Sequence, residues 1–547
     1  MNKGNGANNR KSFVNGKLPD ICIFIFVALF IVIWFYISFL KFYSFNDYYG
    51  DLGQNTSYLI SIFNTRNLNT LFREVRPQSY FSLVIALFLG VFPSALTLIT
   101  LQVLASGFSI VFLYFYSSKV INNKWISFII SISYSLSFSM NATLWQAYGH
   151  IMQFFPFLFF LALLFEERNK KIYSFLIVMA AITNIVTLLS IIILLFVRGI
   201  EDVKKGDFKK ANFLKRFRIS RIITLLFLLI PITLFFVQES LTAFVTFNSG
   251  TFNGSLSLWQ QVNFYLYNFV HTIQDKILVL FLITVPFLFL WNKVNVTYLI
   301  LLPVFVFLLF SNYGVAFFNF QFYISSMLLP LLYFLFLQSY NSTSGIRKYK
   351  TVSKSYIDSD STRGLIIKNV PKRDVKKSAG LYLLVATLIV SLFYAPWGPL
   401  NSQTIPGQNL NAYYNFAQDI HLTNSDIGAD NFLSIIPSNA TVLIQNNMPI
   451  FSNRDRNYIF GPNLIPTNNT SFSPGPVPNT MIPEFIITEN KSIWYTFPFQ
   501  VGGNMEYWFN YYTTRYDYGI RAISGNYVLY ELNYQGNVSV YLRNICY

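Results

Sequence analysis

ICIFIFVALFIVIWFYISFL, residues 21–40, is an almost entirely apolar run without a single charge. A helix of about 20 such residues crosses a hydrocarbon core of roughly 30 Å. The run is longer than the apolar part of a typical signal peptide, and no small-residue cleavage site follows it, so we predict a retained anchor. Comparable runs recur over residues 1–396, and the chain is 53% hydrophobic but only 12% charged. These features predict an α-helical polytopic membrane protein.

The net charge of +17 is concentrated before residue 21 and in the loops 204–221 and 347–377. Basic clusters between spans indicate the cytoplasmic side, so we predict a cytoplasmic N-terminus. Contact with anionic lipid headgroups is a second role for these loops, and nucleic acid is not an expected partner. The two cysteines, Cys22 and Cys546, lie far apart in the chain and predict neither a disulfide framework nor a cysteine metal site.

The basic loops also constrain the number of spans, because each crossing changes sides. The segment 80–90 is short and is followed by Phe-Pro-Ser, so we interpret it as partly embedded or re-entrant. A single helix over 172–197 would place the loop 204–221 outside. Two short helices with a polar turn at Thr183–Asn184 avoid this, and such a break is tolerated where it lines a cavity or is buried in protein. One long tilted helix is the alternative.

This arrangement gives about eleven crossings, assigned by loop charge. The predicted spans are residues 21–40, 95–116, 125–140, one ending near Phe165, the two halves of 172–197, 222–238, 276–291, 295–311, 321–338 and 380–396.

Residues 397–547 are rich in Asn, Pro, Gly and Tyr and predict a small extracytoplasmic α/β domain, distinct from the transmembrane domain 1–396. ATVLIQ (440–445) and EFIITE (484–489) are typical of short buried strands. Residues 519–533 predict a hairpin that turns at Ser524–Gly525–Asn526, followed by a further strand. Glycosylation-type triplets agree with an outer location, although an Asn-rich chain produces them by chance; they begin at Asn439, Asn468, Asn469, Asn490 and Asn537.

The predicted outer side collects most polar groups that could carry chemistry. A carboxylate there can take a proton from an acceptor hydroxyl, and a cation can neutralise a departing phosphate. Solvated loop acids, headgroup-anchoring arginines and a hydrogen-bonded core histidine are the structural alternatives. The chain has no GxGxxG, P-loop, HExxH or paired CxxC motif, so those nucleotide and zinc enzymes have no support. The candidate residues are Asp47, Asp51, Arg73, Glu74, Arg76, Gln78, Tyr148, His150, Thr183, Asn184, Gln321 and Tyr323.

Several stretches, in order, resemble a prokaryotic membrane family catalogued as domain of unknown function 2079. The first two are YYGDLGQNTSYLISIFNT (48–65) and PQSYFSLVIALFLGVFPSALTLITLQVL (77–104). Three more follow: NATLWQAYGHIMQFFPFLFFLALLF (141–165), FFNFQFYISSMLLPLLYFLF (317–336) and IIPSNATVLIQNNMPIFSNRDRNYIF (435–460). The resemblance covers most of residues 45–533. The family in turn is similar to the GT-C membrane glycosyltransferases, which generally take sugars from polyprenyl-phosphate donors.

The resemblance implies a GT-C-like fold in which Asp51 is the catalytic base and Asp47 or Glu74 helps to bind acceptor or a divalent cation such as Mg²⁺ or Mn²⁺. His150 and Arg76 would contact phosphate. Remaining substrate-binding residues would be Tyr148, Asn184, Gln321 and Tyr323, with Tyr48, Tyr49, Tyr58 and Tyr80 stacking on sugar or prenyl chain.

The chain departs from the family pattern at three places. No histidine precedes the segment that starts at Tyr80, Thr183–Asn184 replaces a Lys-Glu pair, and Gln321 precedes Tyr323 without a histidine between them. The preferred interpretation is a glycosyltransferase-like membrane protein that uses a polyprenyl-phosphate-linked sugar. The alternatives are a non-catalytic lipid or glycan carrier or envelope scaffold on a degenerate GT-C fold, and, third, a proton- or ion-coupled transporter.

Overall fold

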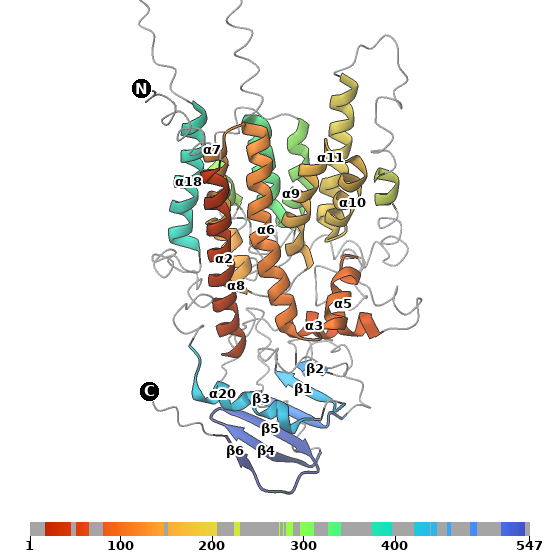
Figure 1. Cartoon of the computed structure of the whole chain (residues 1–547). Coiled ribbons are helices and arrows are strands. Elements are labelled where there is room, and N and C mark those ends of the chain that lie inside the picture. The colour runs from red at the N-terminus through yellow and green to blue at the C-terminus, as the bar shows by residue number, and fades with distance from the viewer. Residues whose placement is uncertain are drawn as a thin grey trace, which may run out of the picture.

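The computed structural model places a helical bundle on a small mixed β-sheet (Figure 1). The residues that it describes are 17–44, 51–64, 80–146, 151–204, 224–229, 273, 277, 280–287, 296–310, 327–340, 375–395, 421–437, 439–445, 457–460, 482–489 and 516–541.

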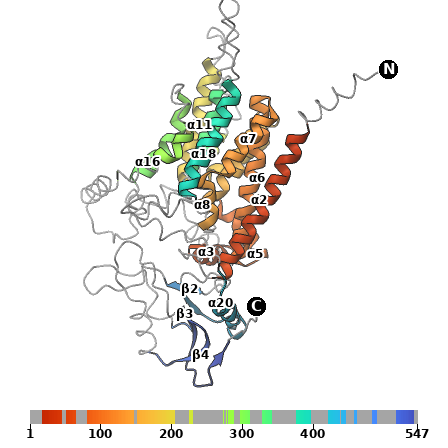
Figure 2. The same cartoon turned by 90° about the vertical axis from the view of Figure 1, so that its left-hand side faces the viewer.

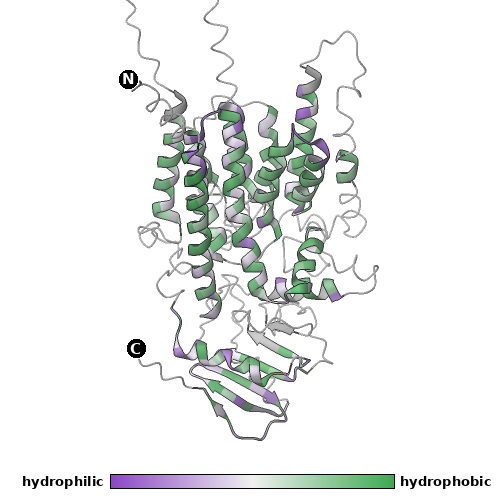
Figure 3. Cartoon of the chain, viewed as in Figure 1, coloured by the Kyte–Doolittle hydropathy of each residue, from purple (hydrophilic) through white to green (hydrophobic). Residues whose placement is uncertain are grey.

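Most helices of the bundle correspond to the predicted apolar runs, whereas α3 (Asp51–Asn64) lies within the predicted first outer loop. Figure 3 shows hydrophobic residues along most of their length. The helices are α2 (Leu18–Tyr43), α3 (Asp51–Asn64), α5 (Ser82–Val91), α6 (Ala95–Ile121), α7 (Lys124–Ser135), α8 (Phe138–Gln146), η1 (Ile151–Phe154), α9 (Phe155–Phe165), α10 (Lys170–Ala181), α11 (Ile185–Lys204), η3 (Val296–Leu301), α16 (Leu302–Phe310) and α18 (Val375–Tyr394), together with the apolar helix Met327–Tyr340.

Two helices of the described residues, α2 and α6, are long and apolar enough to cross a membrane. They pack closely at Gly107, where a Cβ atom would lie 2.5 Å from Cγ1 of Ile31. Small residues at such contacts let helix backbones approach each other in lipid. The opposite side of α2 exposes Leu29, Ile33 and Tyr36, as a lipid-facing helix would.

The prediction of one helix over 125–140 is wrong, because α7 and α8 are separated at Leu136–Ser137. Side chains take over the backbone groups that the break releases. The Asn141 amide donates to the carbonyls of Ser135 (3.0 Å) and Ser137 (2.8 Å), and the Ser391 hydroxyl of α18 donates to Leu136 O (2.6 Å). The serine-rich sequence therefore satisfies the break internally, as hydrocarbon surroundings require.

The later spans are described only in part. Within the predicted spans 222–238 and 276–291, the described residues include helical stretches at 224–229 and 280–284. The span predicted at 295–311 begins as the 3₁₀-helix η3 before α16. The spans predicted at 321–338 and 380–396 correspond to the helix Met327–Tyr340 and to α18.

The C-terminal sheet has the order β2-β1-β3-β5-β4-β6. Its central strand β3 pairs parallel with β1 and antiparallel with β5, so the sheet is mixed. The predicted hairpin is confirmed as β4 and β5, which meet at Gly525, where φ is +56°. The strand β2 was not predicted. The strands are β1 (Val442–Gln445), β2 (Asn457–Phe460), β3 (Phe485–Glu489), β4 (Tyr518–Ser524), β5 (Tyr527–Leu532) and β6 (Ser539–Val540).

The helix α20 (Asn424–Asp430), which the short helix α21 (Phe432–Ile435) follows, packs on β4 and β5. A capping box of Thr423 and Asp426 starts α20. The other carboxylate oxygen of Asp426 accepts a hydrogen bond from the Tyr527 hydroxyl at 2.7 Å. Figures 1 and 2 both show α3 and α5 between the bundle and this sheet, and α3 contacts β2. The sheet therefore adjoins the end of the bundle that carries the predicted chemistry.

Asp430 makes the stability of this domain depend on pH. Burial, followed by the neighbouring Asp426 carboxylate, raises the pKa of Asp430 from 3.8 to about 7. Its Oδ1 atom has no hydrogen-bond partner in the described part of the chain. The residue also ends α20, where the helix dipole disfavours negative charge. Because the folded state binds the proton more tightly, the contribution of Asp430 to stability is fully present below about pH 4 and is lost as the pH rises through about 7.

We expect Asp430→Asn to remove this decline and to raise the free energy of unfolding at pH 8 by about 1–2 kcal/mol. Thermal unfolding of the full chain in detergent between pH 4.5 and 8 measures the effect. Asp517→Asn, at an exposed position of the same domain, is the control and should leave the pH profile unchanged. An Asp430→Asn profile parallel to that of the wild type would contradict the assignment.

Candidate functional site

Most of the predicted site residues lie outside the described residues: Asp47, Glu74, Arg73, Arg76, Gln78, Tyr148, His150, Gln321 and Tyr323. Asp51 is the first residue of α3, but the structure describes only its backbone and not its side chain. Asn184 and Thr183 are described. The site is therefore built from the elements that precede and follow the predicted residues.

A buried cation, Lys41, lies near the end of α2 that leads towards Asp51. Lys41 is only 3% exposed. Its Nζ donates to the carbonyl of Trp145, in the last turn of α8, and lies 4.5 Å from the centroid of the Trp145 ring. The last carbonyls of a helix lack intrahelical partners and carry partial negative charge, so an ammonium group is favourable there. The ring face adds a cation–π attraction of about 0.5–2 kcal/mol.

The contact between Lys41 and Trp145 joins two segments that the sequence singled out. The chain runs from Lys41 to Asp47 and Asp51, and from Trp145 to Tyr148 and His150. A second link fixes α8 against α6, because the buried Gln102 amide donates to Thr143 O at 2.9 Å. The ends of α2 and α8 that precede these two segments therefore lie close together.

The predicted break at Thr183–Asn184 is confirmed, because α10 ends at Ala181 and α11 begins at Ile185, although α11 extends to Lys204 and is not short. Its backbone groups are satisfied locally. The Thr183 hydroxyl donates to Ala180 O at 2.7 Å, and the Thr187 hydroxyl donates to Asn184 O at 2.7 Å. The Asn184 Oδ1 atom accepts from Val186 N at 2.8 Å and so caps α11. The polar Thr-Asn pair forms the turn that its sequence predicts.

The start of α5 is bound to this break. Phe81 N donates to Ile182 O at 3.1 Å. The Phe81 ring also packs on the Phe154 ring, with 5.7 Å between centroids, and Phe154 is the last residue of η1 before α9. The starts of α5 and α9 and the α10–α11 break therefore meet at Phe81.

Gln153, the residue before Phe154, has a buried side-chain amide. The residue is 4% exposed, and neither Oε1 nor Nε2 has a hydrogen-bond partner within the described ranges. Leaving a buried polar group unpaired costs about 1–3 kcal/mol. Such a group in a natural protein calls for an explanation.

Lys41 and Gln153 were both missed by reasoning from sequence. Each is a single polar residue in an apolar run, in SFLKFY (38–43) and IMQFFPF (151–157). Their isolation among apolar residues could have identified them as candidate site residues, because ionisable or amide side chains within apolar segments of a membrane protein tend to be functional.

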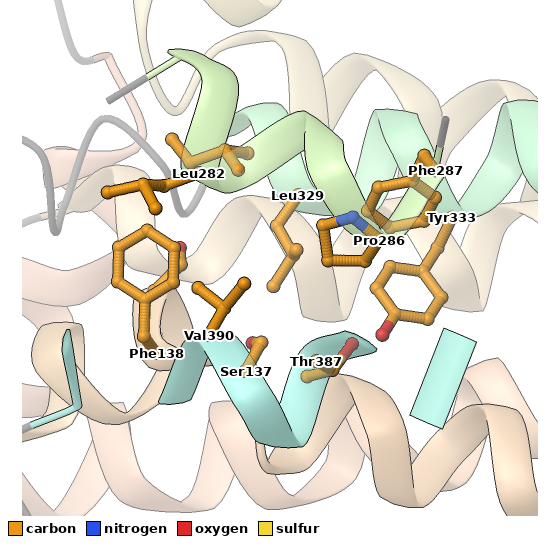
Figure 4. A pocket seen from close by; sticks show the side chains of 11 residues that line it. Ser137, Phe138, Leu282, Pro286, Phe287, Leu329, Tyr333, Thr387 and Val390 are labelled. Atoms are coloured by element: carbon orange, nitrogen blue, oxygen red, sulfur yellow. The ribbon is translucent and has the colours of Figure 1, made fainter. Parts of the chain in front are cut away.

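Figure 4 shows a small cavity at the α7–α8 break. Its volume of about 10 Å³ is close to the 10–15 Å³ that one water needs. The hydroxyls of Tyr333 and Thr387 face each other at its edge in Figure 4, and Tyr333 also shares a hydrogen bond of 2.8 Å with Ser133. This space is too small for a sugar or a lipid chain, so it is not a substrate site. Its lining residues are Ser137, Phe138, Ser139, Leu282, Ile283, Pro286, Phe287, Leu329, Tyr333, Thr387 and Val390.

Four charged groups at the other end of the bundle form two ion pairs. Asp20, at the opposite end of α2 from Lys41, pairs with Lys124 and accepts from the Tyr114 hydroxyl at 2.6 Å. Lys119 pairs with Glu167 at 2.6 Å. These contacts tie α2, α6, α7 and the end of α9 together, so we assign them a structural role.

No described residues form a group of three His, Cys, Asp or Glu that could hold a metal ion. The carboxylates that the sequence proposes for a divalent cation, Asp47 and Glu74, are outside the described residues. The metal prediction therefore stays a prediction.

Comparison with known proteins gives one match. A family model described as "Predicted membrane protein (DUF2079)" matches residues 78–472, which is more than two thirds of the chain. No curated protein and no solved structure matches.

We expect the hydrogen bond from Val186 N to the Asn184 side chain to stabilise the α10–α11 break. Asn184→Ala removes the acceptor of Val186 N and should lower the free energy of unfolding by about 1 kcal/mol. Asn184→Asp keeps an oxygen at the same place and should retain most of the stability. Thermal unfolding of the purified chain in detergent measures both variants. Equal melting temperatures for Asn184→Ala and the wild type would show that the cap does not stabilise the break.

Proposed function

The chain belongs to the DUF2079 family of predicted membrane proteins, and we propose that it transfers a sugar from a polyprenyl-phosphate-linked donor to an acceptor of the cell envelope. The proposal follows the resemblance to GT-C glycosyltransferases. It places the reaction at the end of the bundle next to the C-terminal sheet, on the outer face of the membrane, with the N-terminus in the cytoplasm.

The contact between Lys41 and Trp145 is the observation that supports this function most. A buried ammonium group beside a membrane edge suits a phosphate ester, because charge-assisted hydrogen bonds to phosphate are strong where water is scarce. The same contact joins the segment of Asp47 and Asp51 to that of Tyr148 and His150. An acid, a cation and a histidine would thus serve one reaction centre.

The residues would divide the reaction as follows. The Asp51 carboxylate takes the proton of the acceptor hydroxyl, whose oxygen then bonds to the anomeric carbon of the sugar. The bond between that carbon and the phosphate oxygen breaks, and the leaving phosphate keeps the electron pair. Lys41, with Arg76 and His150, stabilises the phosphate.

Other candidates would bind substrate around this centre. Asp47 and Glu74 supply hard oxygen ligands of the kind that Mg²⁺ or Mn²⁺ prefers, and such an ion would share the phosphate charge. Tyr148, Asn184, Gln321 and Tyr323 would contact the substrate, and Tyr58 and Tyr80 would stack on sugar or prenyl chain.

A non-catalytic carrier or scaffold is the second candidate, and one observation favours it. The family match begins at residue 78, so the proposed base Asp51 lies outside the matched residues. A carrier needs the phosphate-binding cation but not the base. The two functions therefore differ in what Asp51 contributes.

We expect Asp51→Asn to abolish sugar transfer while leaving folding and membrane insertion intact, because the amide cannot accept the proton. Mass spectrometry of co-purified lipids measures the effect: the variant should accumulate a polyprenyl-phosphate sugar that the wild type turns over. Glu167→Gln, at the other end of the bundle, is the control and should match the wild type. Equal retention by Asp51→Asn and the wild type would identify a carrier.

Lys41→Met should reduce the co-purified lipid phosphate by about 10-fold or more, since it removes a charge-assisted hydrogen bond of about 1.5–3 kcal/mol. Lys41→Arg keeps the charge and should retain more of the lipid. Lys119→Met removes a cation that pairs with Glu167 at the other end and should leave the lipid content unchanged. Undiminished lipid phosphate in Lys41→Met would remove Lys41 from the site.

A further inference from the structure

We propose that Gln153 and Asn184 form the part of the site that recognises the hydroxyl groups of the transferred sugar. This inference rests on the proposed function and deepens it, because it names where a neutral, hydroxyl-bearing group is bound. The subsite would lie where the starts of α5 and α9 meet the α10–α11 break.

Gln153 is unusual among the glutamines that the structure describes. The equally buried Gln102 donates to Thr143 O at 2.9 Å, and the half-buried Gln338 donates to the Tyr116 hydroxyl at 2.9 Å. Gln153 is 4% exposed, and neither the oxygen nor the nitrogen of its amide has a hydrogen-bond partner among the residues that the structure describes. The fold satisfies the other two amides but leaves this one for a group that is not part of the chain.

Asn184, at the α10–α11 break, offers a second amide. Its Oδ1 atom is engaged, because it accepts from Val186 N at 2.8 Å. Its Nδ2 group donates to no residue in the described part of the chain, and the side chain is only half-buried. The residue thus presents two hydrogen-bond donors while its oxygen caps α11.

Phe81 links the two segments that carry these amides. Its ring packs on Phe154, which directly follows Gln153, and its backbone N–H donates to Ile182 O, two residues before Asn184. Each amide is therefore one or two residues from a group in contact with Phe81. Three helices that are distant in sequence converge on this residue.

The chemistry of the pair fits a sugar better than a phosphate. A sugar hydroxyl both donates and accepts, so it can pair with the oxygen and with the nitrogen of an amide. Neither Gln153 nor Asn184 carries a charge, whereas Lys41 supplies a cation for phosphate. The packed rings of Phe81 and Phe154, the residue after Gln153, add apolar surface of the kind that the C–H faces of a sugar contact.

The test compares two lipids in nanodiscs that contain the full chain: a polyprenyl phosphate, and the same lipid carrying one glucose. Dissociation constants are measured for the wild type, Gln153→Met and Asn184→Asp. Methionine has nearly the shape of glutamine, and aspartate keeps the cap on α11 but loses the two donors. Gln338→Met, which breaks a satisfied amide contact elsewhere, is the matched control.

We expect the wild type to bind the glucosylated lipid about 10-fold more tightly than the bare lipid, since one or two net hydrogen bonds are gained. Gln153→Met should lose this preference to within about 2-fold, keep its affinity for the bare lipid, and melt no earlier without ligand, because an unpaired amide has been removed. Asn184→Asp should weaken the preference in the same direction. Gln338→Met should keep the preference while melting earlier.

Three results would overturn the inference. A full preference in both Gln153→Met and Asn184→Asp would exclude them from the sugar site, and an earlier melting of Gln153→Met would then point to an amide satisfied by water. Equal binding of both lipids by the wild type would remove the sugar subsite while the lipid-phosphate site stands. Binding of neither lipid by the wild type would instead refute the proposed function itself.

Discussion

The need to satisfy every backbone group away from water governs this structure. A helix break inside an apolar bundle releases N–H and C=O groups that hydrocarbon cannot solvate. Both breaks described here are satisfied by short polar side chains: Asn141 and Ser391 at the α7–α8 break, and Thr183 and Asn184 at the α10–α11 break. The second break also receives the backbone N–H of Phe81. Helix interruptions thus become fixed points on which neighbouring helices are positioned.

These fixed points determine where a site can form. Because α10 and α11 are separate, the start of α5 can lie against the turn between them, and the ring contact with Phe154 brings in the start of α9. The link from Lys41 to Trp145 holds the ends of α2 and α8 together in a similar way. The ends of α2 and α8 and the segments that carry Gln153 and Asn184 are therefore held by contacts within the chain, before any substrate contributes.

How much of this could be predicted depends on which physical signal each feature leaves in the sequence. The α10–α11 break was predictable because the basic loop 204–221 limits the number of crossings, and the hairpin because Ser-Gly-Asn marks a turn where Gly525 has positive φ. The α7–α8 break was missed because serines that bond to their own helix look like part of an apolar span. The strand β2 was missed because its register depends on β1, a pairing that local sequence does not encode. Lys41 and Gln153 could be noticed in the sequence, but their burial and contacts depend on helices that are distant in the chain.

The two ends of the bundle differ in how their polar groups are used, and this difference separates structure from function. At the end that carries Asp20, four described charges form two pairs, Asp20 with Lys124 and Lys119 with Glu167, and the role of these four ends within the protein. At the other end, Gln153 is buried without a partner among the described residues and Asn184 keeps its donors. A fold selected only for stability would replace Gln153 by an apolar side chain of similar volume, since that change removes a desolvation cost at no loss of contacts. Retaining an amide at that position is understandable if something outside the chain binds to it.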